Sequence, residues 1–200
     1  MGELLPKAIY FGGMVAEIIV RIPYNRRRRR IVKVDQRVTG SERVFLGGLF
    51  LTMFLLPLIY SLTSWLNFAN YRMSAVAKAR ASGLGALLLS AAVCLFWRSH
   101  RDLGANWSPS LEISAEQTLV TQGVYGAVRH PMYASHLLWG FAQALLLHNW
   151  IAGLAGLVSF LPMYLVRIPQ EERMMIDHFG DAYRAYRART GSILPQLRRN

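Results

Sequence analysis

Long apolar runs alternate with short charged stretches along the whole 200-residue chain. Five of these runs approach the roughly 20 residues that a helix needs to cross a bilayer. Because backbone polar groups in lipid must pair within their own segment, runs of this kind are predicted to be helical. The pattern therefore predicts an all-α integral membrane protein with about five transmembrane helices, at residues 4–24, 44–68, 81–97, 133–148 and 150–166.

The last two runs are separated only by Asn149, which predicts a tight helical hairpin. At about 1.5 Å per residue each arm covers only about 25 Å, so the arms barely span a hydrocarbon core of about 30 Å. Pro57 and Pro162 are predicted to bend the second and fifth segments. The third segment is rich in small residues, among them Gly85, which favours close helix packing.

Beyond the hairpin, residues 170–190 are charged but keep a helical pattern. Apolar and aromatic residues recur at spacings of seven, four, four and three, at Ile168, Met175, Phe179, Tyr183 and Tyr186. This spacing predicts an amphipathic helix that lies on the bilayer or folds back against the core.

The composition agrees with a membrane protein, and it changes how the net charge is interpreted. Hydrophobic residues make up 53% and charged residues 17%, with a mean hydropathy of +0.23. The net charge of +12 comes from basic residues placed between apolar runs, which is typical of topology signals and anionic lipid contacts. We therefore expect membrane lipids as partners, and no nucleic acid. Cys94 is the single cysteine, which excludes an intrachain disulfide and a cysteine-based metal cluster.

The distribution of basic residues predicts the topology. With five spans and the N-terminus outside, eighteen Lys and Arg residues lie on the cytoplasmic side and four on the other. By the positive-inside rule, the stretches 98–132 and 167–200 then face the cytoplasm.

The chain's most unusual polar cluster is Gly123–His136, GVYGAVRHPMYASH, directly before the fourth apolar run. Polar groups at the mouth of a membrane segment are costly and are usually functional. The hairpin is expected to bring this cluster close to residues 167–172, forming a mixed-charge pocket. A metal site is not expected, because His130 and His136 are poorly spaced for one helical face. The chain also lacks a GxGxxG sequence, a P-loop and a nucleophile elbow.

Two stretches in combination resemble the isoprenylcysteine carboxyl methyltransferase family: GVYGAVRHPMYASH, and RIPQEERMMIDHFGDAYRAYRARTGSILP at 167–195. The resemblance covers about half the chain, from NWSPSLEI at Asn106 to Pro195, and nothing in the first three spans is diagnostic. It implies an integral membrane methyltransferase that uses S-adenosylmethionine at a cytosolic pocket. It also implies a division into N-terminal transmembrane helices, 1–97, and a catalytic region, 98–200.

The resemblance implies roles residue by residue. The cofactor would be contacted by the segment Gln117, Thr118, Leu119 and Val120, by Tyr125, and by the block His130, Pro131, Met132 and Tyr133. A glutamate after the hairpin, which also holds the cofactor, corresponds to Glu171, with Glu172 as the alternative register. An arginine one helical turn earlier corresponds to Arg167, the catalytic and substrate-binding residue that faces the acceptor's carboxylate.

The implied reaction is carboxyl methylation of an isoprenylcysteine-like, lipophilic or prenylated acceptor. A carboxylate is already ionised at neutral pH, so no general base is required. Alternatives are methylation of a phospholipid amine or a thiol, an NADPH-dependent membrane reductase, which shares the RHPxY signature, and a non-enzymatic scaffold. The oligomeric state is not readable from the sequence.

Several of these residues also have ordinary structural interpretations. Glu17 and Arg21 are four residues apart and would form an ion pair on one helical face. Arg129 and Arg167 would reach for the membrane surface from helix ends, and Trp107 would anchor an interfacial loop. Tyr183 and Tyr186 would be packing residues.

Overall fold

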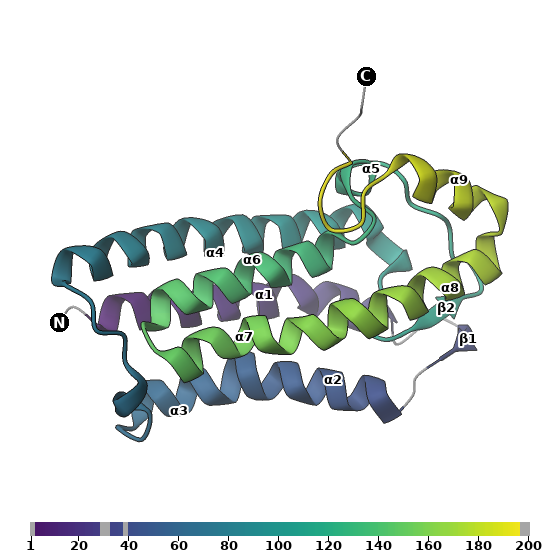
Figure 1. The fold of residues 1–200 in the computed structure, drawn as a ribbon. Helices are drawn as coiled ribbons and strands as arrows, with labels where there is room; N and C mark the ends of the chain where they lie inside the picture. Colours follow the sequence, from purple (N-terminus) through teal and green to yellow (C-terminus); the bar gives the residue numbers. More distant parts are fainter. Residues whose placement is uncertain (1–2, 29–32, 38–39, 197–200) are drawn as a thin grey trace.

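The computed structural model describes residues 3–28, 33–37 and 40–196. Long helices lie side by side as a bundle, and one end of the bundle carries the shorter elements (Figure 1). The long helices are α1 (Leu4–Arg28), α4 (Ala75–Leu103), α6 (Pro131–Leu147) and α7 (Trp150–Pro162). Another wall is formed by α2 (Gly40–Phe50), a π-helical turn η1 (Leu51–Leu55) and α3 (Leu56–Leu62).

The remaining elements gather at the end of the bundle where α4 and α8 finish (Figure 1). They are β1 (Lys33–Gln36), β2 (Glu112–Ser114), α5 (Val124–Ala127), the π-helical turn η4 (Met163–Arg167), α8 (Ile168–Phe179) and α9 (Asp181–Arg189). Short 3-10 turns at η2 (Asn67–Ala69) and η3 (Gly104–Asn106) complete the described chain. The all-α prediction therefore misses one feature, the two-stranded antiparallel sheet of β1 and β2.

Among the described residues, three helical runs are long and apolar enough to cross a membrane, which identifies a membrane protein: Arg43–Leu62, Ala75–Asn106 and Trp150–Phe179. The predicted first span corresponds to α1, with 25 residues, and the fourth to α6, with 17 residues. The third helix is longer than predicted, because it begins at Ala75 and ends at Leu103 rather than covering 81–97. The count of five spans stays a prediction.

Helix α6 is at the centre of the bundle, where it packs against α1, α4 and α7. Close contact depends on small residues: a Cβ atom added to Gly85 of α4 would lie 2.9 Å from the Leu146 side chain of α6. On the other side of α6, a Cβ on Gly140 would lie 2.8 Å from Leu157. The expected close packing through Gly85 is thus confirmed, and these contacts place the C-terminal half of α6 close to both α4 and α7.

The predicted irregularity at Pro57 takes the form of the π-helical turn η1 directly before it. Proline has no N–H, so the Met53 carbonyl four residues earlier loses its helical donor. Tyr10 of α1 replaces that donor, with its hydroxyl 2.6 Å from the Met53 oxygen. Gln143 of α6 donates to the Thr52 carbonyl at 2.9 Å and to the Ala152 carbonyl at 2.6 Å. Buried polar side chains therefore join α1, η1, α6 and α7.

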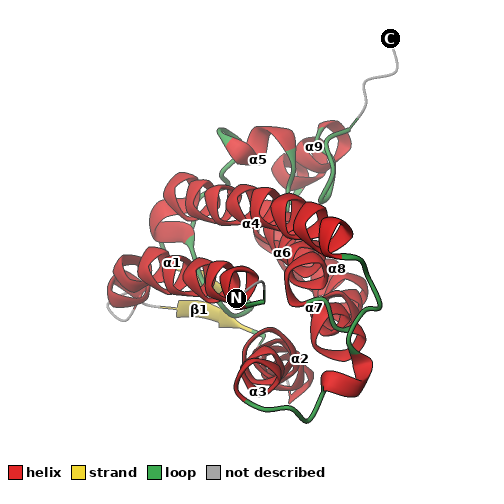
Figure 2. Cartoon of the chain, turned by 90° about the vertical axis from the view of Figure 1, so that its left-hand side faces the viewer, coloured by secondary structure: helices red, strands yellow, loops and turns green. Residues whose placement is uncertain are grey.

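The hairpin is formed as predicted. Asn149 caps α7 by accepting hydrogen bonds from the backbone of Ile151 and Ala152 at 3.0 and 2.9 Å. After Pro162 the helix continues through η4 into α8, so Trp150–Phe179 is one long helical run. The chain then breaks at Gly180, which has a φ of +56°, so the single predicted helix over 170–190 is wrong. Viewed toward the N-terminal end of the bundle, α7 and α8 follow one another on the side away from α1 (Figure 2).

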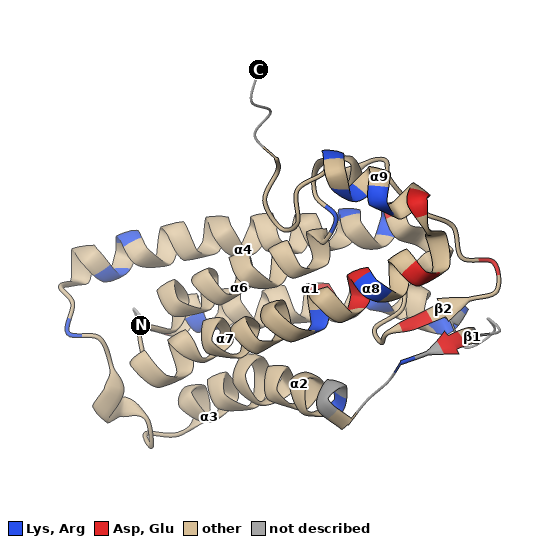
Figure 3. Ribbon diagram, turned by 45° about the vertical axis from the view of Figure 1, so that its right-hand side comes forward, with Lys and Arg blue, Asp and Glu red and all other residues tan. Residues whose placement is uncertain are grey.

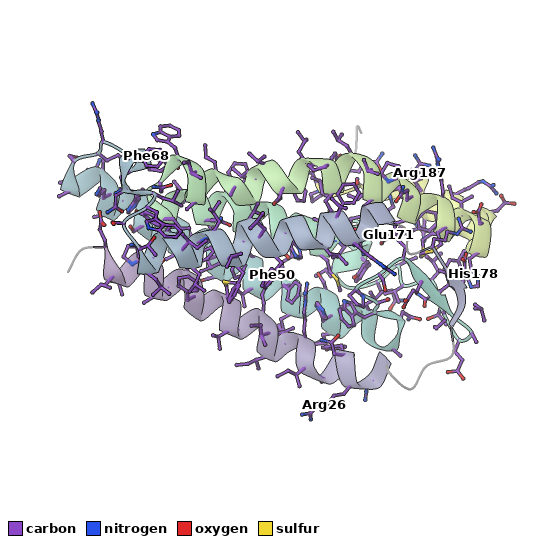
Figure 4. The ribbon with its side chains drawn as sticks, turned by 90° about the horizontal axis from the view of Figure 1, so that it is seen from below. Arg26, Phe50, Phe68, Glu171, His178 and Arg187 are labelled. Carbon is purple, nitrogen blue, oxygen red and sulfur yellow. The ribbon has the colours of Figure 1, made fainter. Side chains whose placement is uncertain are left out.

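Charged residues concentrate at the end of the bundle that carries α8, α9 and the sheet, while the ribbons of α2, α6 and α7 contain very few of them (Figure 3). Glu171, His178 and Arg187 lie at this end, and Phe68 lies at the opposite end (Figure 4). The residues that were predicted to carry chemistry therefore lie at one end of an apolar bundle.

Candidate active site

A cavity of about 530 Å³ opens between α1, α2, α6, α8 and the loop that follows α4. Its volume falls within the roughly 300–1,000 Å³ that is usual for small-molecule sites. Every residue proposed from the resemblance lines it: Gln117, Thr118, Leu119, Val120, Tyr125, His130, Pro131, Met132, Tyr133, Arg167 and Glu171. Residues far apart in sequence are thus brought to one cavity; their individual roles stay predictions.

The loop segment 117–120 is held in place by Asn106. The Asn106 amide donates to the Thr118 hydroxyl at 3.0 Å, and its Oδ1 accepts from the Thr118 N–H at 2.9 Å. Gln117 in turn donates to the Asn106 carbonyl at 3.2 Å. These contacts form a fixed backbone edge on the cavity, next to Leu119 and Val120.

The turn before Tyr125 requires glycine. Gly123 has a φ of +61°, and an added Cβ would lie only 2.1 Å from Asp102 Oδ2. That oxygen accepts from the Val124 N–H at 2.9 Å, which satisfies the first amide of the short helix α5. The Asp102 carboxylate therefore sets the direction in which Tyr125 enters the cavity.

Residues 129–131, here called the RHP segment, are fixed by the C-terminal part of the chain. The Arg129 and His130 amides donate to the carbonyls of Gly191 and Ser192, at 2.8 and 3.0 Å. Pro131 follows at the first turn of α6, where a missing N–H is harmless. Residues 190–192, which follow α9, are thus part of the scaffold of the site.

Glu172 joins the surrounding elements. Its Oε1 accepts from Arg129 Nε and Nη2, at 3.0 and 2.8 Å, and lies 3.2 Å from His130 Nε2. Its Oε2 forms an ion pair with Arg187 of α9 at 3.1 Å. Arg129 also donates to the backbone carbonyl of Thr190. Glu172 therefore holds α9 and the RHP segment together.

Glu171 faces the cavity instead. The Tyr133 hydroxyl donates to Glu171 Oε2 at 2.6 Å, and His130 Nδ1 lies 3.8 Å from Glu171 Oε1, beyond hydrogen-bonding distance. His130 Nδ1 is buried and has no hydrogen-bond partner in the described part of the chain. Because buried polar nitrogens are nearly always satisfied, this atom indicates a ligand position beside Glu171.

Arg167 occupies the π-helical turn η4, between the apolar helix α7 and the polar helix α8. Its side chain is 7% exposed, and Nη2 donates to the Pro109 carbonyl at 2.6 Å. The cavity-facing guanidinium is thus anchored to the loop after α4, in a position suited to an anionic ligand group.

Two tyrosines that were assigned to packing also line the cavity, Tyr183 and Tyr186 of α9. The Tyr186 hydroxyl donates to the Tyr125 carbonyl at 2.6 Å. Burial raises the pKa of Tyr186 to about 12, and burial next to Glu171 raises the pKa of Tyr125 well above its ordinary value. Both phenols are therefore neutral at physiological pH, and both remain hydrogen-bond donors.

Other structural interpretations change as well. Trp107 is 4% exposed and lies 4.9 Å from the His100 ring, so it is a wall of the cavity rather than an interfacial anchor. Arg129 is bound to Glu172 and does not extend toward the membrane surface. Glu17 and Arg21 line the cavity and attract one another electrostatically, while Glu17 Oε1 and Arg21 Nε have no hydrogen-bond partner in the described residues. Their one-turn spacing gave no signal that separates a cavity position from a self-neutralising pair.

Within the described residues, no group of three or more His, Cys, Asp or Glu side chains is arranged to hold a metal ion.

Comparison with known proteins finds a family that part of the chain resembles. The isoprenylcysteine carboxyl methyltransferase (ICMT) family matches residues 84–177, which contain the loop, the RHP segment, the hairpin and Glu171. The chain is 34% identical to protein-S-isoprenylcysteine O-methyltransferase B of Arabidopsis thaliana over 94 residues, covering 46% of this chain and 48% of the relative.

Two further relatives carry the name protein-S-isoprenylcysteine O-methyltransferase. The one from Schizosaccharomyces pombe is 33% identical over 82 residues, 41% of this chain and 35% of the relative. The human one is 27% identical over 166 residues, 80% of this chain and 58% of the relative. The chain thus spans between about a third and three fifths of the length of these relatives.

Proposed function

We propose, from the match of residues 84–177 to the isoprenylcysteine carboxyl methyltransferase family, that this protein methylates the carboxylate of a lipophilic, isoprenylcysteine-like acceptor with S-adenosylmethionine. The observation that carries the proposal is the pairing of Tyr133 with Glu171 beside the unsatisfied Nδ1 of His130, in a cavity that also contains Arg167. The family implies a methyl donor, and the cavity supports one with both polar and cationic parts.

Glu171 and His130 suit the polar groups of the donor. The Glu171 carboxylate accepts hydrogen bonds from ribose hydroxyls or from an ammonium group, and His130 Nδ1 is the second contact. The segment 117–120 and Tyr125 supply backbone and aromatic edges around the rest of the molecule. When bound, S-adenosylmethionine supplies an electrophilic methyl carbon, whose bond to sulfur breaks as the bond to the acceptor's oxygen forms.

Arg167 suits the acceptor's carboxylate. A guanidinium binds a carboxylate by two parallel hydrogen bonds, which fixes both distance and direction. The carboxylate is already ionised, so the residues need only align the two reactants and keep water out. Apolar side chains of α2 and η1, Leu46, Leu49, Phe50 and Met53, form the part of the cavity wall that suits a lipid chain.

The same proposal includes the orientation in the membrane. Five spans, with the N-terminus outside, expose the charged end of the bundle to the cytoplasm, from which a polar donor arrives. The acceptor, a lipophilic or prenylated molecule, reaches the cavity from the bilayer, where membrane lipids surround the apolar helices.

The proposal is tested by calorimetry of S-adenosylhomocysteine binding to the detergent-solubilised protein. Glu171→Gln and His130→Ala each remove one charge-assisted or buried hydrogen bond, so each is expected to weaken binding about tenfold or more. Glu116→Gln, on the exposed part of the same loop, is the matched control and is expected to bind like the wild type. Unchanged affinity in both site variants, or stabilisation by NADPH alone, contradicts the proposal.

A further inference from the structure

The phenol of Tyr183 on α9 lines the cavity and has no part in the chemistry described so far. Its residue is only 2% exposed, so the protein encloses it almost completely. The other three tyrosines of the cavity, Tyr125, Tyr133 and Tyr186, each donate a hydrogen bond to a protein oxygen. The Tyr183 hydroxyl makes no hydrogen bond within the described residues. Because buried hydroxyls are nearly always hydrogen-bonded, this one indicates a contact that a ligand completes.

The position of Tyr183 is set by the way in which α9 is attached to the site. Helix α9 begins after the break at Gly180 and lies beside α5 (Figures 1 and 2). Tyr183 and Tyr186 are three residues apart on one face of α9, and their ring centroids are 5.9 Å apart. The Tyr186 hydroxyl is bound to the Tyr125 carbonyl at 2.6 Å. The scaffold therefore holds the Tyr183 ring at the cavity and leaves its hydroxyl available.

Two carboxylates act on the Tyr183 phenol, and one of them faces the same space. Burial, together with the charges of Glu172 and Glu171, raises the pKa of Tyr183, so the phenol stays protonated at physiological pH. Both oxygens of Glu172 are occupied by basic side chains of the scaffold. Glu171 lines the cavity and binds Tyr133 through Oε2 alone. Tyr183 and Glu171 therefore present a hydrogen-bond donor and a hydrogen-bond acceptor to one part of the cavity.

A phenol beside a carboxylate suits a hydroxyl group, because a hydroxyl donates one hydrogen bond and accepts others. The hydroxyl groups of S-adenosylmethionine belong to its ribose. We infer that Tyr183 binds S-adenosylmethionine, and that its hydroxyl donates to the ribose hydroxyl that itself donates to Glu171. This inference rests on the proposed function and adds α9 to the elements that contact the methyl donor.

The hydroxyls of Tyr183 and Tyr186 then have opposite effects on the unliganded protein. The Tyr183 hydroxyl is buried without a protein partner, so its removal costs no hydrogen bond until the ligand is bound. Removal of the Tyr186 hydroxyl instead leaves the buried Tyr125 carbonyl without its donor. Two tyrosines on one helix face thus allow ligand binding and structural support to be measured separately.

The test is calorimetry of the detergent-solubilised protein with S-adenosylhomocysteine, which has the same ribose. Tyr183→Phe removes only the hydroxyl and is expected to weaken binding about fivefold, the effect of one neutral hydrogen bond. The melting temperature of the unliganded protein is expected to stay equal or to rise in this variant, and to fall in Tyr186→Phe. Tyr164→Phe is the control, because Tyr164 stacks on Phe160 outside the cavity, and it is expected to keep the wild-type affinity.

Deoxyribose analogues of the ligand distinguish a direct contact from a structural effect. The 2′-deoxy and 3′-deoxy forms of S-adenosylhomocysteine each lack one ribose hydroxyl, and one of them is expected to bind the wild type more weakly. With that analogue Tyr183→Phe is expected to cause no further loss, because the partner of the phenol is already absent. An equal loss with all three ligands would mean that Tyr183 only supports the fold, and the inference is then wrong.

The same measurements separate this inference from the proposed function. If Glu171→Gln weakens S-adenosylhomocysteine binding and Tyr183→Phe does not, the inference fails and the proposed function stands. If the wild type does not bind S-adenosylhomocysteine at all, both fail.

Discussion

Glu171 and Glu172 are neighbours in sequence that have different surroundings. Successive residues of a helix point in directions about 100° apart, so one side chain faces the cavity while the other faces the RHP segment and α9. Tyr133 donates to Glu171, whereas Arg129, His130 and Arg187 surround Glu172. Of the two glutamates that could hold the cofactor, Glu171 is therefore favoured, because only Glu171 extends toward a space that a ligand can occupy.

Glu172→Gln is expected to lower the free energy of unfolding by about 1–3 kcal/mol, because it weakens charged hydrogen bonds to Arg129. Thermal unfolding of the detergent-solubilised protein measures this change. The affinity for S-adenosylhomocysteine is expected to fall less than in Glu171→Gln. A variant with full stability but no ligand binding would show that Glu172, and not Glu171, holds the donor.

Gly123→Ala is expected to destabilise the site by roughly 1–3 kcal/mol, since its φ of +61° and ψ of −134° define a conformation that L-residues rarely adopt. The added Cβ would also displace Asp102 from the start of α5. Gly83→Ala on α4, where an added Cβ meets nothing within 4 Å, is the control and is expected to keep or raise the melting temperature. Equal melting temperatures for the two variants would contradict this account of the turn.

For single residues, the sequence predicted a position on the cavity where a motif was present. Every residue implied by the resemblance lies on the cavity, whereas Arg129, Tyr183 and Tyr186 fitted ordinary structural patterns and were assigned to them. A tyrosine on the apolar face of a helix has the same spacing whether its hydroxyl is satisfied by water or by the Tyr125 carbonyl. Only the path of the chain after Gly180 distinguishes the two cases.

Among the elements, the π-helical turn η1 shows how a proline becomes a connection between helices. The carbonyls released around Pro57 accept hydrogen bonds from Tyr10 and Gln143, which belong to α1 and α6. The wall formed by α2 and α3 is therefore fixed to the centre of the bundle by polar contacts, and its position sets the width of the apolar part of the cavity.

Gln143→Leu is expected to destabilise the protein by about 1–3 kcal/mol, because the carbonyls of Thr52 and Ala152 lose their donor in an apolar interior. Unfolding in mixed micelles measures the loss. Gln196→Leu, at an exposed position outside the bundle, is expected to have little effect. A neutral result for Gln143→Leu would mean that the wall is held by apolar packing alone.

The elements that the sequence predicted well are those with long periodic patterns. The hairpin at Asn149 and the irregularities after Pro162 and before Pro57 follow from residues with one dominant backbone effect. The sheet was missed because strands of four and three residues are too short to show a period of two. The break at Gly180 was missed because the apolar spacing continues across it.

On the scale of the whole molecule, charge is distributed along one axis. The bundle has a charged end with α8, α9 and the sheet, and an end around Phe68 with few charges (Figures 3 and 4). This asymmetry agrees with the positive-inside count, since both depend on where Lys and Arg are placed. The orientation of this axis in the membrane is our proposal, and it has a direct test.

Single cysteines report the orientation. In a Cys94→Ser background, Glu116→Cys is expected to react with an impermeant maleimide only from the cytoplasmic side, and Ser64→Cys only from the outer side. Both positions are exposed and lie at opposite ends of the bundle, so access by the reagent is limited only by the bilayer. Labelling of both from the same side would overturn the predicted topology.

The unbroken helical run from Trp150 to Phe179 has a mechanical consequence. At 1.5 Å per residue, Glu171 lies about 32 Å along this rod from Trp150, close to the thickness of a hydrocarbon core. The rod cannot shorten, so a thicker or thinner bilayer changes its tilt and draws Glu171 into the lipid or lifts it out. The acyl-chain length of the surrounding lipids therefore changes the depth of the cavity in the membrane. It does so without any change to the residues that line the cavity.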